Sequence, residues 1–106
     1  MYDPTYFENL STLLPTIPED SIVSKTVVKN EHMDVILFGF APGQSLSEHT
    51  SARPAMLYFL SGEAELTLGD RMETAVPGTF AAMPPHLPHS ITAKTAVSML
   101  LILTKA

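Results

Sequence analysis

The sequence has no cysteine and no tryptophan, and only 16% of its 106 residues are charged. Without cysteine, the chain cannot form a disulfide framework, a thiolate metal site or a cysteine nucleophile. Any metal that it binds must be held by histidine, by carboxylate or by water. The sequence contains four histidines, so each can be considered individually.

Cationic residues are also scarce: six Lys and Arg stand against eleven Asp and Glu, which gives a formal charge of -5. Because nucleic acids and anionic membranes are bound through clustered cations, neither is favoured as a partner. The first 14 residues lack the basic head of a secretion signal. The apolar run 97–103 is far shorter than the roughly 20 residues that span a bilayer. We therefore expect a cytoplasmic protein whose partner is a small molecule.

Length and composition predict a single domain. A chain of 106 residues suits one domain and not two, and a hydrophobic content of 45% is typical of a folded protein. Residues 1–20 are predicted to form an N-terminal segment, and residues 21–106 a β-barrel. Within the segment, apolar residues at helical spacing precede Pro15 and predict one short helix. They are Phe7, Leu10, Leu13 and Leu14.

From residue 21 onward, the pattern changes to short runs that are rich in β-branched residues and separated by Gly, Pro, Asn or Asp. Eight such runs in so short a chain predict an all-β fold, an antiparallel barrel or jelly roll. Alternation in the run 63–68 turns Ala64, Leu66 and Leu68 toward the core. The run 97–103 is apolar on both faces, so its outer side should be covered too, by a second subunit for example. The eight runs are 22–28, 35–41, 55–60, 63–68, 72–76, 79–83, 90–92 and 97–103.

His49 follows the Pro42-Gly43 turn and His89 follows the proline-rich run 83–88, and such stiff turns can aim their side chains. Together with Gly43, Gly62 and Gly78, the two histidines have a spacing that resembles the two motifs of the cupin superfamily. The first motif runs Gly, five residues, His-x-His, three or four residues, Glu, six residues and Gly. The second motif runs Gly, a spacer, Pro-x-Gly, two residues and His, and it is matched from Gly78 to His89. The resemblance implies a cupin-type barrel. The first motif's positions are Gly43, His49, Ser51, Ala55 and Gly62, with the spacing kept in full.

The resemblance also implies a metal site, which this chain keeps only in part. In metal-binding cupins the ligands are both His and the Glu of the first motif and the His of the second. Those positions here hold His49, Ser51, Ala55 and His89, so two of the four ligands are missing. His86 replaces the usual glycine of the second motif and adds an imidazole three residues before His89. A divalent ion (Zn, Fe, Ni, Mn or Cu) held by His49, His89 and His86 is one interpretation, and a metal-free pocket is the other.

Further residues are candidates for the wall of the pocket. Ser51 and Ala55 would offer a hydroxyl and room to an organic ligand, and Met83 is placed to touch it. Arg53 is expected near the mouth of the barrel, either as a clamp for a substrate carboxylate or as a solvated surface residue. No catalytic residue can be assigned from the sequence.

Three functions stay open at this point. The first is a cupin that binds a small organic molecule, with or without a weakly held divalent metal. The second is a metal-dependent dioxygenase or isomerase in which His86 is the third ligand. The third is a metal-free sensing or carrier module. Small cupins are commonly dimers, so the resemblance also implies a homodimer.

Overall fold

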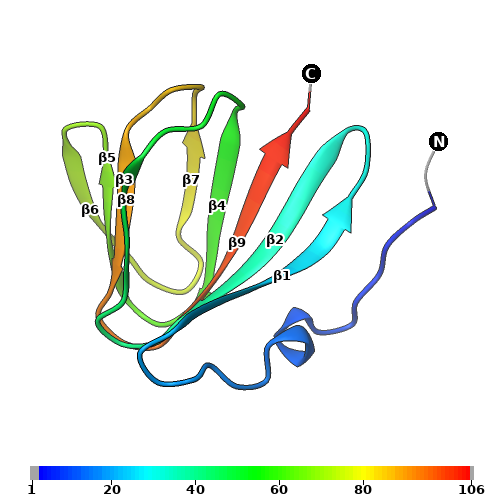
Figure 1. The fold of residues 1–106 in the computed structure, drawn as a ribbon, viewed down its shortest axis with the longest axis horizontal. Helices are drawn as coiled ribbons and strands as arrows, with labels where there is room; N and C mark the ends of the chain where they lie inside the picture. The colour runs from blue at the N-terminus through cyan, green and yellow to red at the C-terminus, as the bar shows by residue number, and fades with distance from the viewer. Residues whose placement is uncertain (1–2, 106) are drawn as a thin grey trace.

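The computed structural model describes residues 3–105, which form two antiparallel β-sheets that face each other (Figure 1). One sheet has five strands in the order β1-β2-β9-β4-β7, and the other has four in the order β3-β8-β5-β6. The predicted all-β jelly roll is confirmed. The strands are β1 (Ile22–Lys29), β2 (Met33–Phe40), β3 (Ser45–His49), β4 (Ala55–Ser61), β5 (Ala64–Leu68), β6 (Arg71–Ala75), β7 (Phe80–Met83), β8 (His89–Ala93) and β9 (Val97–Thr104).

Alternation along the strands separates the buried core from the surface. In β4, β5 and β9, every second residue near the middle of the sandwich points between the sheets, and Leu57, Leu66 and Met99 are at most 2% exposed. The inward positions predicted for β5 are confirmed, because Ala64 and Leu66 are buried and Leu68 packs against the core. Each large apolar side chain buried in this way stabilises the fold by about 1.5–3 kcal/mol.

A tight turn at Gly62 carries the chain from the five-stranded sheet to the four-stranded sheet. The φ angle of Gly62 is +82°, and a Cβ at this position would lie 2.0 Å from the carbonyl oxygen of Ala96. Only glycine adopts this backbone conformation readily and avoids the contact. The junction of the two sheets therefore depends on a residue without a side chain.

The helix predicted near the N-terminus is a single 3₁₀ turn, η1 (Leu10–Leu13). The side chain of Asn9 caps it by accepting a hydrogen bond from the backbone N–H of Ser11 at 3.0 Å. Pro15 disfavours the helical conformation at the residue before it, and Leu14 has φ -132° and ψ 72°. No helix in the described part of the chain is long and apolar enough to span a membrane.

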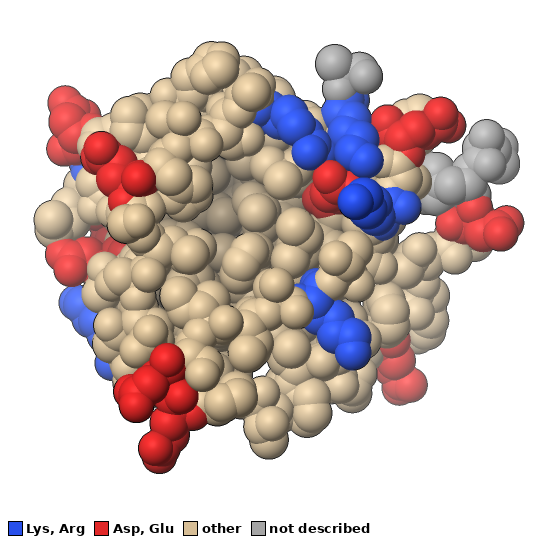
Figure 2. Space-filling view, in the orientation of Figure 1, with Lys and Arg blue, Asp and Glu red and all other residues tan. Residues whose placement is uncertain are grey.

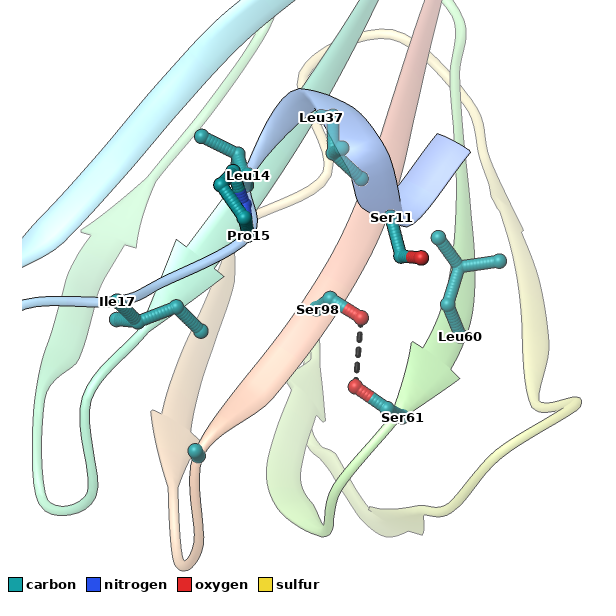
Figure 3. Close-up of a pocket in the computed structure, with 9 residues that line it drawn as sticks. Ser11, Leu14, Pro15, Ile17, Leu37, Leu60, Ser61 and Ser98 are labelled. Carbon is teal, nitrogen blue, oxygen red and sulfur yellow. Dashed lines mark hydrogen bonds between the residues drawn. The ribbon is translucent and has the colours of Figure 1, made fainter. Parts of the chain in front are cut away.

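The N-terminal segment lies against the outer face of the five-stranded sheet. Leu14 and Ile17 line, together with Leu37 and Ser98 of the sheet, a cavity of about 280 Å³ (Figure 3). Ile17 approaches so closely that a Cβ on Gly39 would meet its Cγ1 at 2.9 Å. Part of the outer side of β9 is thus covered by this chain itself, whereas the sequence suggested a second subunit for that role.

Candidate functional site

A β-bulge turns His49 into the space between the sheets. β3 pairs with β8 so that Leu46 lies opposite Ile91 and His49 lies opposite His89. Three steps along β3 therefore match two along β8, and a bulge absorbs the extra residue. In a regular strand, side chains three positions apart point to opposite faces, so Leu46 and His49 share the inner face only because of the bulge. His49 is the last residue of β3, a strand that is not among the eight runs predicted from the sequence.

The two imidazoles meet between the sheets. Their ring centroids lie 4.1 Å apart, with an angle of 59° between the ring planes. His89 is only 6% exposed and shares the buried face of β8 with Ile91 and Ala93, whereas His49 is exposed and forms the solvent-facing side of the pair. The structure thus brings together the two histidines that the motifs single out.

Main-chain contacts orient both rings in the same way. Nδ1 of His49 lies 2.7 Å from the carbonyl oxygen of Ser47, and Nδ1 of His89 lies 2.9 Å from that of Leu87. A carbonyl oxygen can only accept a hydrogen bond, so Nδ1 is the donor in both contacts. In a neutral ring this leaves Nε2 with a free lone pair, and within residues 3–105 neither Nε2 has a hydrogen-bond partner. The site therefore presents two acceptor nitrogens side by side.

Ser51 and Ala55 stand where metal-binding cupins have their other two ligands, and neither residue adds a ligand atom to the histidine pair. Ala55 begins β4, is 3% exposed, and lies opposite Met83 in the neighbouring strand, so its methyl belongs to the core. Ser51 lies in the loop between β3 and β4, where its Oγ accepts a hydrogen bond from the backbone N–H of Arg53 at 3.1 Å. Of the predicted pocket residues, Ala55 and Met83 thus contribute apolar core and Ser51 holds its own loop.

His86 joins two loops through its main chain. Its backbone N–H donates to the carbonyl oxygen of Ser51 at 2.7 Å, its φ is +68°, and its side chain is exposed. The contact ties the β7–β8 loop to the β3–β4 loop at the end of the sandwich where β9 finishes (Figure 1). Within residues 3–105, no three His, Cys, Asp or Glu side chains are grouped so that they could hold a metal. The His86 imidazole therefore does not join His49 and His89 as a third ligand.

Arg53 belongs to a charged cluster at the same end of the sandwich. Its Nη1 lies 3.1 Å from Oδ2 of Asp34, and its Nε and Nη2 donate to the carbonyl oxygens of Thr104 and Leu103 at 2.8 and 3.2 Å. Nζ of Lys105 lies 3.1 Å from Oδ1 of the same carboxylate. Neither interpretation from the sequence describes Arg53 fully, because its guanidinium connects the β3–β4 loop to β2 and β9.

Asp34 and Lys105 were not singled out in the sequence, because nothing near either residue indicates its partner. The Asp34 side chain is only 15% exposed and faces the inner side of β2, opposite Leu103. The Lys105 ammonium, followed by the Arg53 guanidinium, holds the pKa of Asp34 below its ordinary value, while partial burial acts in the opposite direction. Asp34 is therefore an ionised carboxylate that organises this end of the sandwich.

The donor set fits a metal site of the cupin kind only in part. Two imidazoles whose Nδ1 atoms are fixed by carbonyl oxygens resemble ordered metal ligands, in which the second nitrogen is usually hydrogen-bonded. Catalytic metal centres usually have three protein ligands, however, and Ala55 stands where the carboxylate would be. The residues present do not make the three-ligand centre of a metalloenzyme.

Comparison with known proteins places this arrangement in a family. Residues 36–104 match the family described as Cupin domain. A conserved protein of unknown function from Streptococcus pyogenes has 28% identity and a TM-score of 0.85, covering 99% of this chain and 91% of that chain. A cupin superfamily protein from Desulfitobacterium hafniense has 28% identity and a TM-score of 0.86, covering 96% and 95%.

More distant matches show the fold alone. The polyketide cyclase RemF from Streptomyces resistomycificus has 19% identity and a TM-score of 0.74, covering 85% of this chain and 71% of that chain. No curated protein matches the sequence significantly. Because the family match runs from β2 to the end of β9 and includes both histidines of the pair, the chain belongs to the Cupin domain family.

Proposed function

We propose that this cupin binds a small organic molecule between its two sheets, with Nε2 of His49 and Nε2 of His89 as the polar contact. The observation that carries the proposal is the bulge in β3, which puts His49 on the inner face beside His89. Bulges are frequent next to functional sites, where they re-aim a side chain that regular pairing would turn away. The two rings also have no charged partner, among the residues that the structure describes, that would give them a purely structural role.

The walls of this space support the same proposal. Apolar side chains from both sheets pack against the core while they keep part of their surface exposed. The face drawn in Figure 2 is hollowed near its middle, and the charged side chains visible there lie away from the hollow. Small-molecule sites are typically hollows lined mainly by apolar groups, and the absence of Lys, Arg, Asp and Glu from the visible wall agrees with this. The partly buried apolar residues that pack against the core are Ile22, Phe38, Leu46, Leu68, Leu87, Leu101 and Leu103.

The experiment is an NMR titration with p-cresol, which combines an apolar ring with one hydroxyl donor. We expect the imidazole ¹⁵N signals of His49 and His89 to shift together, with one dissociation constant, while those of His32 and His86 stay in place. His49→Leu and His89→Leu should each weaken binding by about tenfold, as loss of a hydrogen bond in an apolar site predicts. His86→Leu is the matched control. If neither ring responds to the probe, the proposal is wrong.

A divalent ion held by His49, His89 and water is a second candidate, favoured by the shared orientation of the two rings. When bound, such an ion would supply Lewis-acid chemistry. Two protein ligands predict weak binding, and a variant that combines Ser51→His with Ala55→Glu restores the complete motif. We expect the double variant to retain metal through purification and the natural protein to lose it. Retention of about one ion per natural chain, lost in His49→Leu, would make the ion the primary ligand instead.

We also propose that the protein forms a homodimer through the outer face of the five-stranded sheet. Tyr58 lies opposite Phe80 and Leu100 on the side of the sheet that faces away from buried Leu57. Tyr58 and Phe80 are 38% and 58% exposed and lie directly opposite each other, so they form a contiguous apolar patch, a feature that marks interaction sites. Light scattering should give the mass of two chains, and Tyr58→Glu with Phe80→Glu the mass of one. A monomeric natural protein would overturn this proposal.

A further inference from the structure

We infer that the interior ligand is an uncharged, mainly apolar molecule that carries a hydroxyl or N–H donor, and not a carboxylate or a phosphate. This inference rests on the proposed function and adds the chemical class of the ligand. Three observations carry it: the hydrogen-bonding character of the histidine pair, the state of the cations at the rim, and the composition of the walls.

The histidine pair offers acceptors to whatever lies beside it. Both Nδ1 atoms are occupied by main-chain carbonyl oxygens, so the atom of each neutral ring that can face a ligand is Nε2, with its lone pair. A carboxylate or a phosphate is itself an acceptor, and its oxygens would face these lone pairs without a proton between them. A hydroxyl or N–H group instead donates to Nε2. The pair therefore discriminates by hydrogen-bond direction.

Arg53 and Lys105, the cations at the end of the sandwich where β9 finishes, contact groups of the protein itself. Three nitrogens of Arg53 contact Asp34 or main-chain oxygens of β9, and Nζ of Lys105 contacts Asp34 and donates to the carbonyl oxygen of Asn30 at 2.7 Å. Every nitrogen of the two cations thus has a partner within the protein, although a guanidinium carries five N–H bonds and an ammonium three, so that some N–H bonds remain. The contacts to Asp34 and to main-chain oxygens hold both head groups in place, which disfavours their turning to clamp a ligand carboxylate in the bidentate manner.

A second group of charges lies where the edge of β6 approaches the edge of β7. Arg71 and Glu73 lie opposite Leu68 and Leu66 on the inner side of the four-stranded sheet, and they form an ion pair with each other. Their side chains are 73% and 45% exposed, so the pair is solvated. A cavity of about 350 Å³ at this seam is lined by the ion pair together with Leu66, Leu68 and Ala81. The charges of Arg71 and Glu73 on the inner side of β6 therefore balance each other, and the side chains beneath them are apolar.

The walls make an unpaired charge unfavourable. Leu68 lies directly opposite His89, and Leu46 is the inner-facing residue of β3 that precedes His49 across the bulge. An anion between such side chains would leave water without finding a donor, and burial of an unpaired charge is strongly unfavourable. A neutral molecule loses far less on leaving water and gains apolar contact on both sides. Burial, hydrogen-bond direction and the engaged cations all favour the same class of ligand.

Three probes of one shape separate the possibilities: p-cresol, 4-methylbenzoate and 4-methylanisole, titrated at about pH 8, where imidazoles are ordinarily neutral. They present a neutral donor, an anion and a neutral group without a donor. We expect p-cresol to bind at least tenfold more tightly than 4-methylbenzoate and several-fold more tightly than 4-methylanisole, with the ring signals of His49 and His89 as the readout. Equal or tighter binding of 4-methylbenzoate would overturn the inference and leave the proposed function standing. Equal binding of p-cresol and 4-methylanisole would overturn its donor part, and no response to any probe would overturn both proposals.

A variant tests directly the role of the charged cluster formed by Asp34, Arg53 and Lys105. Asp34→Asn removes the carboxylate that holds Arg53 and Lys105, so it should raise the affinity for 4-methylbenzoate by about tenfold and leave that for p-cresol nearly unchanged. Glu63→Gln is the matched control, because it releases Lys94 from an exposed ion pair of 3.5 Å between loop residues beside β5 and β8. If Asp34→Asn folds and binds 4-methylbenzoate no better than the natural protein does, engagement of the cations is not what excludes anions.

Discussion

The two sheets of this cupin differ in what their residues do. The five-stranded sheet has three strands of eight residues, and its central strand β9 is paired on both sides, to β2 and β4. The four-stranded sheet has strands of five residues, yet it carries the bulge and both histidines of the pair. The long pairings of the five-stranded sheet stabilise the fold although they shift register between Thr26 and Val28 and between Phe59 and Ser61. The shift in the short strand β3 instead aims a histidine at a second histidine. Stability and chemistry are thus concentrated on opposite sides of one interior.

The largest expected effect comes from the junction of the sheets. Gly62→Ala should destabilise the protein by several kcal/mol, or prevent folding, because φ is +82° and the new Cβ would lie 2.0 Å from a backbone oxygen. Gly43→Ala is the matched control: its φ is +83°, but beyond its chain neighbours no atom lies within 4 Å of the point where the new Cβ would stand. It should cost only about 1–2 kcal/mol of backbone strain. Equal losses in urea unfolding would show that close packing at Gly62 does not hold the sheets together.

A second prediction compares the sheets through their leucines. Leu57→Ala in β4 should lower the free energy of unfolding by about 2–5 kcal/mol, because the side chain is 2% exposed and the cavity cannot collapse fully. Leu46→Ala in β3 removes a half-buried side chain and should cost about half as much. Chemical denaturation followed by circular dichroism measures both. A larger loss in Leu46→Ala would reverse the assignment of stability to the five-stranded sheet.

A third prediction separates chemistry from stability within the four-stranded sheet. His89→Leu replaces a buried imidazole by an apolar side chain and leaves the carbonyl oxygen of Leu87 without the N–H donor that it has in the natural protein. The free energy of unfolding should fall by no more than about 1–3 kcal/mol, while the p-cresol response weakens about tenfold. Parallel unfolding and binding experiments on one preparation give the answer. A strongly destabilised variant would make His89 a structural residue of the core.

The smallest expected effect is the pH dependence due to Asp34. Its pKa is lowered in the folded protein, chiefly by Lys105, so its contribution to stability is complete above the ordinary value of 3.8 and is lost as the pH falls through the folded pKa. The difference in stability between the natural protein and Asp34→Asn should therefore shrink in acid. Urea midpoints from about pH 7 down to about pH 2 test this. A difference that stays constant would show that the carboxylate is not held by its cations.

The regular parts of the fold could be predicted from the sequence, and its irregular parts could not. Eight strands follow from apolar runs and turn residues, since β-branched alternation and Gly or Pro punctuation are local signals. β3 escaped prediction because Ser45–His49 contains a single leucine, and the bulge interrupts the two-residue period on which such predictions rest. The short helix predicted near the N-terminus is only a 3₁₀ turn, and it ends just before Pro15, the residue from which its end was predicted.

The candidate site shows the same difference between features that the sequence predicts and features that it does not. Motif spacing was sufficient to propose that His49 and His89 lie together, because their positions are set by the family resemblance. The orientation of His86 depends on a left-handed backbone at that residue, which nothing in the sequence signals for histidine. The engagement of Arg53 depends on Asp34 and Lys105, which reach it only through the pairing of β2 with β9. Contacts made between distant strands have no local signature.

The most direct test of the central claim is the long-range ¹H–¹⁵N spectrum of the imidazole rings in the free protein at about pH 8. The account predicts that His49 and His89 both carry their proton on Nδ1 and that their ring protons show a nuclear Overhauser effect to each other, as a centroid distance of 4.1 Å requires. A proton on Nε2 of either ring, together with no Overhauser effect between the rings, would contradict the claim that the bulge builds one paired acceptor site.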